Sequence, residues 1–278
     1  AVQRPLTRKE GKELGQFKKS IWKSWGRDKV TSPMPESAPA APKAPKAPKA
    51  PKASKPATTN AYSKVDVSGW EKVGGQRGSN PGGTFTDSAG VEHYIKTPST
   101  PLHAENESLA STLYNMLGVN AADVQVGDDN GQVKTVSKIV QGARSATSSD
   151  KKQMQSAFVA DAWLGNWDAV LNDNTLIDSS GKPVKIDVGG SMLFRARGGA
   201  KGAQFGDTVG EIDTLRQRNS VYADITDAQI KEQVKALKSV SADMIKAQVK
   251  AILTDSAQAT KLADTLIARR QDLINRYG

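Results

Sequence analysis

Apolar residues change their spacing part-way along the chain. Residues 91–95 and 134–140 are short segments in which polar and apolar residues mix, and glycine, asparagine and aspartate cluster between such segments, most clearly at residues 128–131. Short segments separated by turn-forming residues predict β-strands joined by turns. After about Asp150 the spacing becomes three and four, and the apolar residues that share one face are Met154, Phe158, Val159 and Trp163. This second pattern predicts a helix over residues 154–163.

The last seventy residues predict three more helices. Thr226 and Gln229 stand three positions apart ahead of an apolar run, which is the spacing of an N-terminal capping box. A strand-rich first part followed by a helix-rich second part predicts an α+β fold of two lobes. We expect a strand-rich N-lobe at about residues 61–142 and a small helical C-lobe at about residues 143–278.

The amino-acid composition excludes several kinds of chemical site. The 278 residues include no cysteine and two histidines, His93 and His103. Disulfides, thiolate metal sites, iron–sulfur clusters and cysteine nucleophiles are therefore excluded, and little remains for a histidine-rich metal centre. His93 alternates with Tyr94 in a strand pattern, which favours an exposed strand residue over a catalytic base. No apolar run approaches the roughly 20 residues of a membrane helix, and charges stand where a signal peptide has its apolar core. We expect neither a membrane span nor secretion through a cleaved signal.

The basic excess of the chain lies in its first sixty residues. They hold 14 lysines and arginines against 4 acidic residues, whereas residues 61–278 hold 25 of each kind. Nine of the 13 prolines lie there too, and residues 41–56 repeat an Ala-Pro-Lys unit. Such a segment buries too little apolar surface to offset the entropy of ordering. Residues 1–60 are therefore predicted to be a flexible, extended basic tail.

A short amphipathic helix is predicted within that tail, at residues 12–26. Leu14, Phe17, Ile21 and Trp25 recur there at intervals of three and four. Three roles stay open for it: a solvated, weakly helical segment, a docking peptide for an acidic or apolar partner surface, or a nucleic-acid arm in which Trp22 and Trp25 stack on bases.

Five glycines fall within residues 74–83. Glycines let backbone N–H groups approach phosphate oxygens closely, although a surface loop without a ligand can have the same composition. The segment is neither a Walker P-loop, which needs Gly-Lys-Ser/Thr, nor a dinucleotide fingerprint that opens a helix. On this segment alone both interpretations stay open.

A lysine on a strand and a glutamate on a helix follow in order. Lys96 ends a predicted strand, and residues 105–107, Glu-Asn-Glu, begin a predicted helix. A strand lysine that is held by a glutamate of the next helix suits contact with the α- and β-phosphates of ATP. Glu107 is the better partner than Glu105 because it lies nearer the body of the helix.

Carboxylates arranged for phosphoryl transfer lie farther along the chain. Asp168 follows the predicted helix, Asn172 and Asn174 come four and six residues later, and Asp187 follows an apolar strand and a turn. The first aspartate can accept the proton of an acceptor hydroxyl, while an asparagine and the second aspartate hold Mg²⁺ against the phosphates. Either asparagine fits this role.

These segments resemble a known group. The phrases GSNPGG, YIK, AENESLASTLY, DAWLGNWDAV and IDVGGSMLFR are similar to the atypical protein-kinase-like domains of HipA toxin kinases, actin-fragmin kinase and phosphatidylinositol 4-kinases, and closer still to small kinase-like domains encoded by bacteriophages. The resemblance covers about residues 74–197 and implies a two-lobed protein-kinase-like fold. It also implies nucleotide contact by Gly78, Ser79, Asn80, Gly82, Gly83 and Lys96, a lysine-holding carboxylate at Glu107, a catalytic carboxylate at Asp168, metal ligation by Asn174 (or Asn172) and Asp187, and an adenine-facing strand and hinge at residues 136–142.

The chain departs from the pattern of these relatives after Asp168, because Ala169 stands where many of them carry a basic residue. Arg195, Arg197 and Lys201 form a basic, glycine-rich stretch after Asp187, which either binds phosphate or acceptor or is a solvated loop. Trp163 and Trp167 are expected in the core rather than stacked on a ligand.

The resemblance implies an ATP- and Mg²⁺-dependent phosphotransferase that acts on a serine or threonine hydroxyl of a protein, encoded by a phage and present in the cytoplasm of the infected bacterium or in the virion. The rival hypothesis is a virion structural or packaged protein with an inactive kinase-like scaffold, whose basic tail binds capsid, portal or nucleic acid. Fold alone does not decide between the two.

Overall fold

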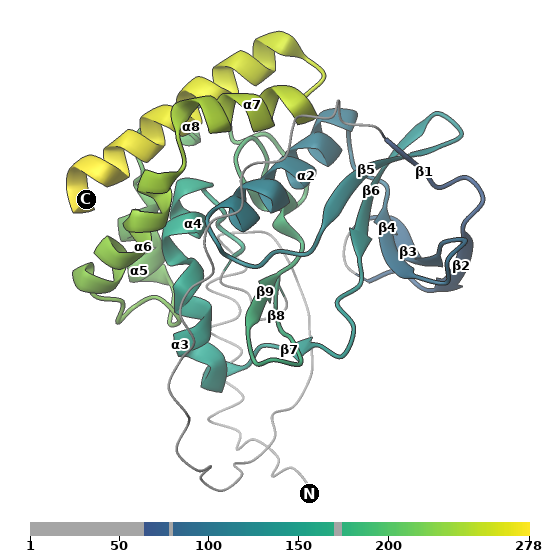
Figure 1. Cartoon of the computed structure of the whole chain (residues 1–278), viewed down its shortest axis with the longest axis horizontal. Coiled ribbons are helices and arrows are strands. Elements are labelled where there is room, and N and C mark those ends of the chain that lie inside the picture. The colour runs from purple at the N-terminus through teal and green to yellow at the C-terminus, as the bar shows by residue number, and fades with distance from the viewer. Residues whose placement is uncertain (1–63, 78–79, 170–173) are drawn as a thin grey trace, which may run out of the picture. The chain divides into compact units, whose positions relative to one another are not determined.

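The computed structural model describes residues 64–77, 80–169 and 174–278 (Figure 1). The chain forms two units, Ala1–Pro56 and Ala57–Gly278, and every helix and strand below belongs to the second. The predicted basic tail and its helix at residues 12–26 lie outside the described residues, as do Gly78, Ser79 and Asn172.

The first part of the described chain is a six-stranded sheet. Its strands are β1 (Val65–Asp66), β2 (Glu71–Gly74), β3 (Gly82–Thr86), β4 (Glu92–Lys96), β5 (Val124–Asp129) and β6 (Gln132–Lys138), in the order β1-β5-β6-β4-β3-β2. Neighbours are antiparallel except β1 and β5. The predicted turn between β5 and β6 is confirmed: Asn130 and Gly131 both have positive φ, 51° and 87°, as a two-residue hairpin turn requires.

Helix α2 (Pro101–Met116) connects β4 to β5 and begins earlier than the sequence suggested. The prediction placed the start near Glu105, but Thr100 caps the helix and Pro101 occupies its first turn. Proline suits this position because its fixed φ is helical and its missing N–H would have no partner there. The helix packs against β5, β6 and α7 (Ala242–Ile252), so it lies between the sheet and the C-terminal helices (Figure 1).

A small second sheet leads toward the predicted acidic residues. It consists of β7 (Arg144–Ser145), β8 (Thr175–Ile177) and β9 (Pro183–Lys185), all antiparallel. The backbone of Lys185 also bonds to the segment before β5, donating to the carbonyl of Asn120 at 2.8 Å and accepting from Ala122 at 2.8 Å. These bonds set the position from which the chain enters Asp187.

The helix predicted at residues 154–163 is interrupted. The structure has α3 (Lys151–Met154), a 3₁₀ turn (Gln155–Ala157) and α4 (Phe158–Trp163). The side-chain amide of Gln233 accepts from the N–H of Val159 at 3.0 Å and donates to the carbonyl of Gln155 at 3.0 Å. In an uninterrupted helix those two backbone groups would bond to each other, so Gln233 takes the place of one helical hydrogen bond.

The remaining helices are α5 (Glu211–Arg218), α6 (Asp227–Ser239), α7 and α8 (Ser256–Tyr277). The sequence predicted three helices in the last seventy residues, and the structure has these four there. The Thr226 capping box is confirmed: Gln229 N–H donates to Thr226 Oγ1 at 3.3 Å, and Thr226 N–H donates to Gln229 Oε1 at 2.9 Å. No helix in the described ranges is long and apolar enough to cross a membrane.

The main core lies among α2, α4 and the C-terminal helices, and a smaller cluster of Val67, Ile95 and Val136 lies on the six-stranded sheet. Trp163 is fully buried, as expected, and donates its indole N–H to the carbonyl of Leu266 at 3.0 Å. Trp167 is only half-buried. A strand-rich lobe and a helical lobe are thus both present, as the sequence predicted.

Candidate active site

Lys96 stands at the end of β4 between two carboxylates from distant parts of the chain. Its ammonium lies 2.6 Å from Glu107 Oε1, on α2, and 2.8 Å from Asp187 Oδ1, just after β9. The side chains of Lys96 and Glu107 are 9% and 4% exposed, whereas that of Asp187 is 55% exposed. The three predicted residues therefore meet, and the meeting point opens to solvent on the side of Asp187.

The two carboxylates keep Lys96 charged. Burial by itself lowers the pKa of the Lys96 ammonium, but the attraction of Glu107 and Asp187 outweighs burial and holds that pKa above its usual value. Burial raises the pKa of Glu107, and the Lys96 charge opposes that rise. A buried cation shared between a buried and an exposed carboxylate is the state expected at neutral pH.

The two glutamates of α2 contact different partners. Glu105 accepts from Thr254 Oγ1 at 2.8 Å and from Thr254 N–H at 3.2 Å, so it connects α2 to the loop between α7 and α8. Glu107 alone of the pair reaches Lys96. Two positions along a helix turn a side chain by about 200°, which explains why the neighbours face opposite ways.

Asn106 holds the loop of residues 187–191, called here the Asp187 loop. Its Nδ2 donates to the carbonyls of Gly189 at 3.2 Å and Ser191 at 3.0 Å, and its Oδ1 accepts from the N–H of Leu193 at 3.2 Å. Helix α2 thus supplies both the partner of Lys96 and the support for the loop that carries Asp187. Asn106 lies in the AENESLASTLY motif, but the sequence pattern predicted no role for it.

Asp168 lies in the loop of residues 165–169, called here the Asp168 loop, and is buried. Its N–H donates to Asn166 Oδ1 at 3.2 Å, and its carbonyl accepts from Asn174 Nδ2 at 3.2 Å. A Cβ atom at Gly190 would come within 2.8 Å of Asp168 Oδ2. The absence of a side chain at Gly190 therefore lets the Asp168 carboxylate lie against the Asp187 loop.

A buried polar cluster beneath the Asp168 loop escaped the sequence analysis. The carboxylate of Asp161 accepts from the hydroxyls of Tyr114, at 2.7 Å, and Tyr222, and lies 2.9 Å from Lys185 Nζ. Lys185 Nζ also donates to the carbonyl of Ala169 at 2.9 Å. Burial, and then the Asp161 charge, raise the pKa of both tyrosines well above the usual value, so their hydroxyls remain donors. The cluster holds the backbone next to Asp168.

No protein-family model matches the chain, and no curated protein matches it in sequence. Among solved structures, CtkA, a proinflammatory kinase of Helicobacter pylori, superposes with a TM-score of 0.56 over 77% of this chain and 98% of that chain, at 14% sequence identity. The chain has a protein-kinase-like fold. An aminoglycoside phosphotransferase of Alicyclobacillus acidocaldarius (TM-score 0.34, 12% identity, 76% of this chain and 92% of that chain) and a MAP kinase of Leishmania major (TM-score 0.30, 11% identity, 76% and 83%) are similar at scores too low to carry an argument.

In this kinase-like fold the described part of the predicted phosphate loop is largely strand. Gly82 and Gly83 open β3, paired with Lys96 and Ile95 on β4, and Asn80 is half-buried just before them. A Cβ atom at Gly82 would overlap the carbonyl oxygen of Ile95. Close strand pairing accounts for this glycine, and phosphate contact by Asn80, Gly82 and Gly83 stays a prediction.

The histidines take different places. His93 lies on β4, on a strand as expected, with Nε2 2.9 Å from Asp87 Oδ2. The expectation that it is exposed is wrong, because its side chain is half-buried beside the Trp70 ring. His103 is buried on α2, with its ring centroid 4.7 Å from that of Phe194. Burial, and then the Lys96 charge, lower the pKa of His103, so its imidazole is neutral at pH 7. Its proximity to the Lys96 site had no signal in the sequence.

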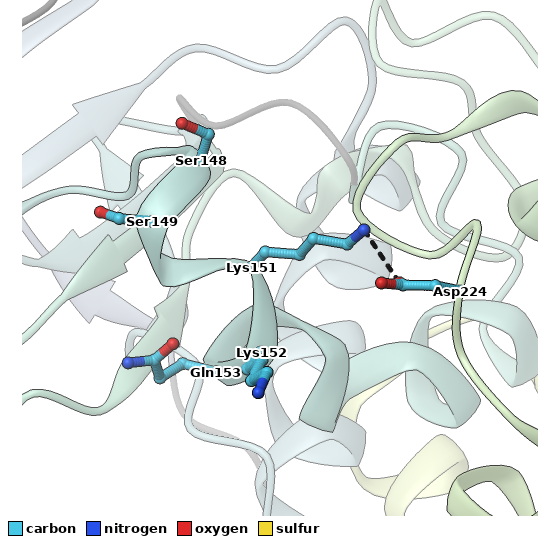
Figure 2. A pocket seen from close by; sticks show the side chains of 6 residues that line it. All are labelled: Ser148, Ser149, Lys151, Lys152, Gln153 and Asp224. Atoms are coloured by element: carbon cyan, nitrogen blue, oxygen red, sulfur yellow. Dashed lines mark ion pairs between the residues drawn. The ribbon is translucent and has the colours of Figure 1, made fainter.

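A separate hollow of about 590 Å³ is lined by Ser148, Ser149, Lys151, Lys152, Gln153 and Asp224 (Figure 2). The Lys151 ammonium and the Asp224 carboxylate in it lie 2.9 Å apart, and the two side chains are 34% and 65% exposed. None of these residues was predicted to bind nucleotide or metal. The candidate active site is therefore the meeting point of Lys96, Glu107 and Asp187, with Asp168 beside the same loop.

Proposed function

We propose that this chain is an ATP- and Mg²⁺-dependent phosphotransferase that acts on a serine or threonine hydroxyl of a protein. One observation carries the proposal: the ammonium of Lys96 lies within 2.8 Å of both Glu107 and Asp187, which come from a helix and a loop far apart in sequence. A buried cation beside an exposed carboxylate suits a phosphate and the metal ion that accompanies it.

The donor set fits ATP and Mg²⁺. Asp187 offers an exposed carboxylate, and Asn174, whose Nδ2 donates to the carbonyl of Asp168, has its amide oxygen as an acceptor. Oxygen ligands of this kind suit Mg²⁺, which keeps several waters and binds one or two carboxylates plus phosphate oxygens. Among the described residues no group of three or more His, Cys, Asp or Glu side chains could hold a metal ion by itself. Bound Mg²⁺ would supply charge neutralisation at the phosphates.

The chain's own residues have distinct parts in the transfer. Lys96 binds the α- and β-phosphates, and Glu107 orients Lys96. Asp168 receives the proton of the acceptor hydroxyl as the acceptor oxygen forms its bond to the γ-phosphorus and the bond to the bridging β–γ oxygen breaks, which leaves ADP. Asp161 and Lys185 keep the Asp168 loop in place through the Ala169 carbonyl.

The phage origin of the chain is part of the same proposal and rests on the resemblance of its motifs, with which the basic tail agrees. We propose that it acts in an infected bacterium or is carried in the virion, with residues 1–60 contacting nucleic acid or an acidic protein surface such as a capsid or portal. Fractionation of phage particles from infected cells tests this, because a virion protein co-purifies with the particles.

The nucleotide proposal is tested by thermal unfolding of the full chain with millimolar ATP and Mg²⁺. Ligand linkage predicts a higher melting temperature for the parent. Lys96→Met and Asp187→Asn should lose that increase, because the first removes the phosphate cation and the second weakens the metal ligand. Lys246→Met and Asp264→Asn change the same residue types at exposed positions of α7 and α8 and should keep it.

Transfer from γ-labelled ATP to the protein's own serines and threonines then tests activity. A parent that is not stabilised by ATP and Mg²⁺ contradicts the proposal and leaves the scaffold hypothesis. A parent that is stabilised but transfers no phosphate to itself or to any candidate partner is a nucleotide-binding pseudokinase.

A further inference from the structure

Lys201 is buried between the two loops that carry the candidate catalytic residues. It is 3% exposed, so the solvated-loop interpretation is wrong for this residue, whereas Arg195 and Arg197 are exposed. Its ammonium donates to the carbonyl of Gly165 at 2.5 Å and to the carbonyl of Gly190 at 2.7 Å. Gly165 lies in the Asp168 loop and Gly190 in the Asp187 loop, so one ammonium joins both.

Two aromatic rings lie near this ammonium. It lies 5.0 Å from the ring centroid of Trp167, the residue before Asp168, and 5.9 Å from that of Phe205. The guanidinium of Arg195 lies 5.8 Å from the same Trp167 ring. Trp167 was expected in the core, but it is half-buried and contacts two cations. Cation–π contacts of this kind add to the attraction that holds a buried ammonium in place.

Four charged side chains act on Lys201 from separate elements. Glu211 on α5 and Asp168 on its loop attract the ammonium, and Arg269 on α8 and Arg195 after the Asp187 loop repel it. Burial is the largest influence, and together with the two arginines it outweighs the carboxylates and lowers the pKa of Lys201 to about 7. The ammonium thus exchanges its proton in the range where the protein would work.

We infer that Lys201 is a positioning residue that holds the Asp168 loop against the Asp187 loop through its bonds to Gly165 and Gly190. The inference rests on the proposed phosphotransferase. Proton acceptance at Asp168 and phosphate binding beside Asp187 must occur within one reacting geometry, and a misplacement of about 1 Å in such a site can cost roughly a hundredfold in rate. Lysine suits the task because its compact ammonium has three donors that can point at carbonyls on different sides.

The first test compares the full-length parent with Lys201→Met, which keeps the length of the side chain and removes its charge and donors. The turnover rate of phosphoryl transfer should fall about tenfold to a hundredfold, while KM for ATP and the ATP-induced rise in melting temperature stay near the parent values. The parent rate should fall as pH rises above about 7, since loss of the proton weakens the tie, and Lys201→Met should lack this decline. Lys261→Met, at an exposed position of α8, is the matched control and should behave like the parent.

Amide hydrogen exchange of the unmodified chain supplies a test that needs no variant. Residues 164–168 and 188–192, which include the bonds of Met192 N–H to the Leu164 carbonyl and of Ser191 N–H to the Val188 carbonyl, should open more often at pH 8 than at pH 6 after correction for intrinsic exchange. Helices α6 and α7 should not change.

The possible failures are distinct. Lys201→Met within twofold of an active parent, or exchange in both loops that does not depend on pH, overturns the role given to Lys201. If Lys201→Met loses both the ATP-induced rise in melting temperature and phosphoryl transfer, the role is overturned as well. The substitution then disrupts nucleotide binding too, and not only the position of the two loops. A parent that binds no ATP overturns the proposed function and, with it, any catalytic purpose for Lys201.

Discussion

The guanidinium of Arg269 lies 2.9 Å from the carboxylate of Glu211, and both side chains are buried, at 0% and 6% exposure. Arg269 also donates to the carbonyls of Ala162 and Trp163, each at 2.7 Å, which belong to the last turn of α4. A cation at the C-terminal end of a helix is favourable because unpaired carbonyls gather there. Helix α8 therefore fixes the end of α4, from which the Asp168 loop begins.

Arg269→Met should be strongly destabilising. It leaves Glu211 charged and buried without its partner, and breaking one half of a buried ion pair costs about 3–5 kcal/mol. Arg270→Met is the matched control, since Arg270 donates to the Leu237 and Lys238 carbonyls from a half-buried position, and its loss should cost about 1 kcal/mol. Urea unfolding measures both. If both variants lose the same free energy of unfolding, the burial of the Arg269–Glu211 ion pair does not increase its contribution to stability.

Glu107→Gln and Glu105→Gln should differ in their effect on ATP. The first removes the charged partner of Lys96, and hydrogen bonds to charged groups contribute about 1.5–3 kcal/mol, so we expect the Kd of ATP with Mg²⁺ to rise about tenfold or more. The second changes a contact with Thr254 and should leave Kd within about twofold. Isothermal titration calorimetry distinguishes them. A similar rise in both variants would attribute the effect to the anchoring of α2 rather than to the ion pair.

Features set by near neighbours could be predicted from the sequence. The Asn130-Gly131 turn and the Thr226 capping box each depend on residues within four positions, so local pattern suffices. The order of Lys96, Glu107 and Asp187 along the chain also indicated one site, and the structure brings these three side chains together.

Features set by distant residues could not be predicted in this way. Gln233 interrupts the helix at residues 154–163 from 74 positions away along the chain. For Lys201 the sequence favoured a solvated loop over phosphate or acceptor binding, because lysine is seldom buried, and only the fold brings the Gly165 and Gly190 carbonyls to it. The sequence pattern assigned no role to Asp161, because only the fold brings Tyr222 and Lys185 to its carboxylate from other elements.

Asp150 should make the stability of the chain depend on pH. The Arg144 guanidinium donates to both Asp150 oxygens, at 2.7 and 2.8 Å, and together with the N–H of Thr147 holds the pKa of Asp150 well below its usual value. The ordinary pKa of an aspartate in an unfolded chain is about 3.9. The folded state therefore gains stability from the ionised carboxylate above that pH, and this gain is lost as pH falls below it.

Asp150→Asn should accordingly lower the melting temperature most at pH 6–7, and its difference from the parent should shrink as pH falls below about 4. Asp264→Asn, at an exposed position of α8, should show a small difference at every pH. Calorimetric melts across pH 3–7 measure this. A difference for Asp150→Asn that does not vary with pH would show that its charge is not what stabilises the fold.

The basic tail should bind polyanions by charge. The tail has 14 basic and 4 acidic residues, whereas the remainder of the chain has 25 of each. We therefore expect the affinity of the full chain for DNA to fall steeply between about 50 and 200 mM salt through counterion release. Replacing Lys43, Lys46, Lys49 and Lys52 with glutamine should reduce the slope of log K against log salt by up to about 3–4. The same change at four exposed helix lysines, Lys231, Lys235, Lys246 and Lys261, should matter less. If DNA affinity changes neither with salt nor with either set of substitutions, the tail does not bind by charge, and a specific protein partner becomes the better explanation.

A substitution at Asp168 should reduce phosphoryl transfer without reducing nucleotide binding. Its carboxylate lies against Gly190, whereas the Asp187 carboxylate contacts Lys96, and the proposed work of Asp168 is to accept the proton of the acceptor hydroxyl. Asp168→Ala should therefore leave the ATP-induced melting shift nearly intact while transfer from labelled ATP falls about a hundredfold or more, the range of general-base catalysis. Asp264→Ala is the exposed control and should transfer at the parent rate. If the carboxylate merely stabilises its own loop, Asp168→Ala lowers stability by about 1 kcal/mol and transfers nearly as fast as the parent, and the assignment of the catalytic carboxylate is then wrong even if the chain is an active phosphotransferase.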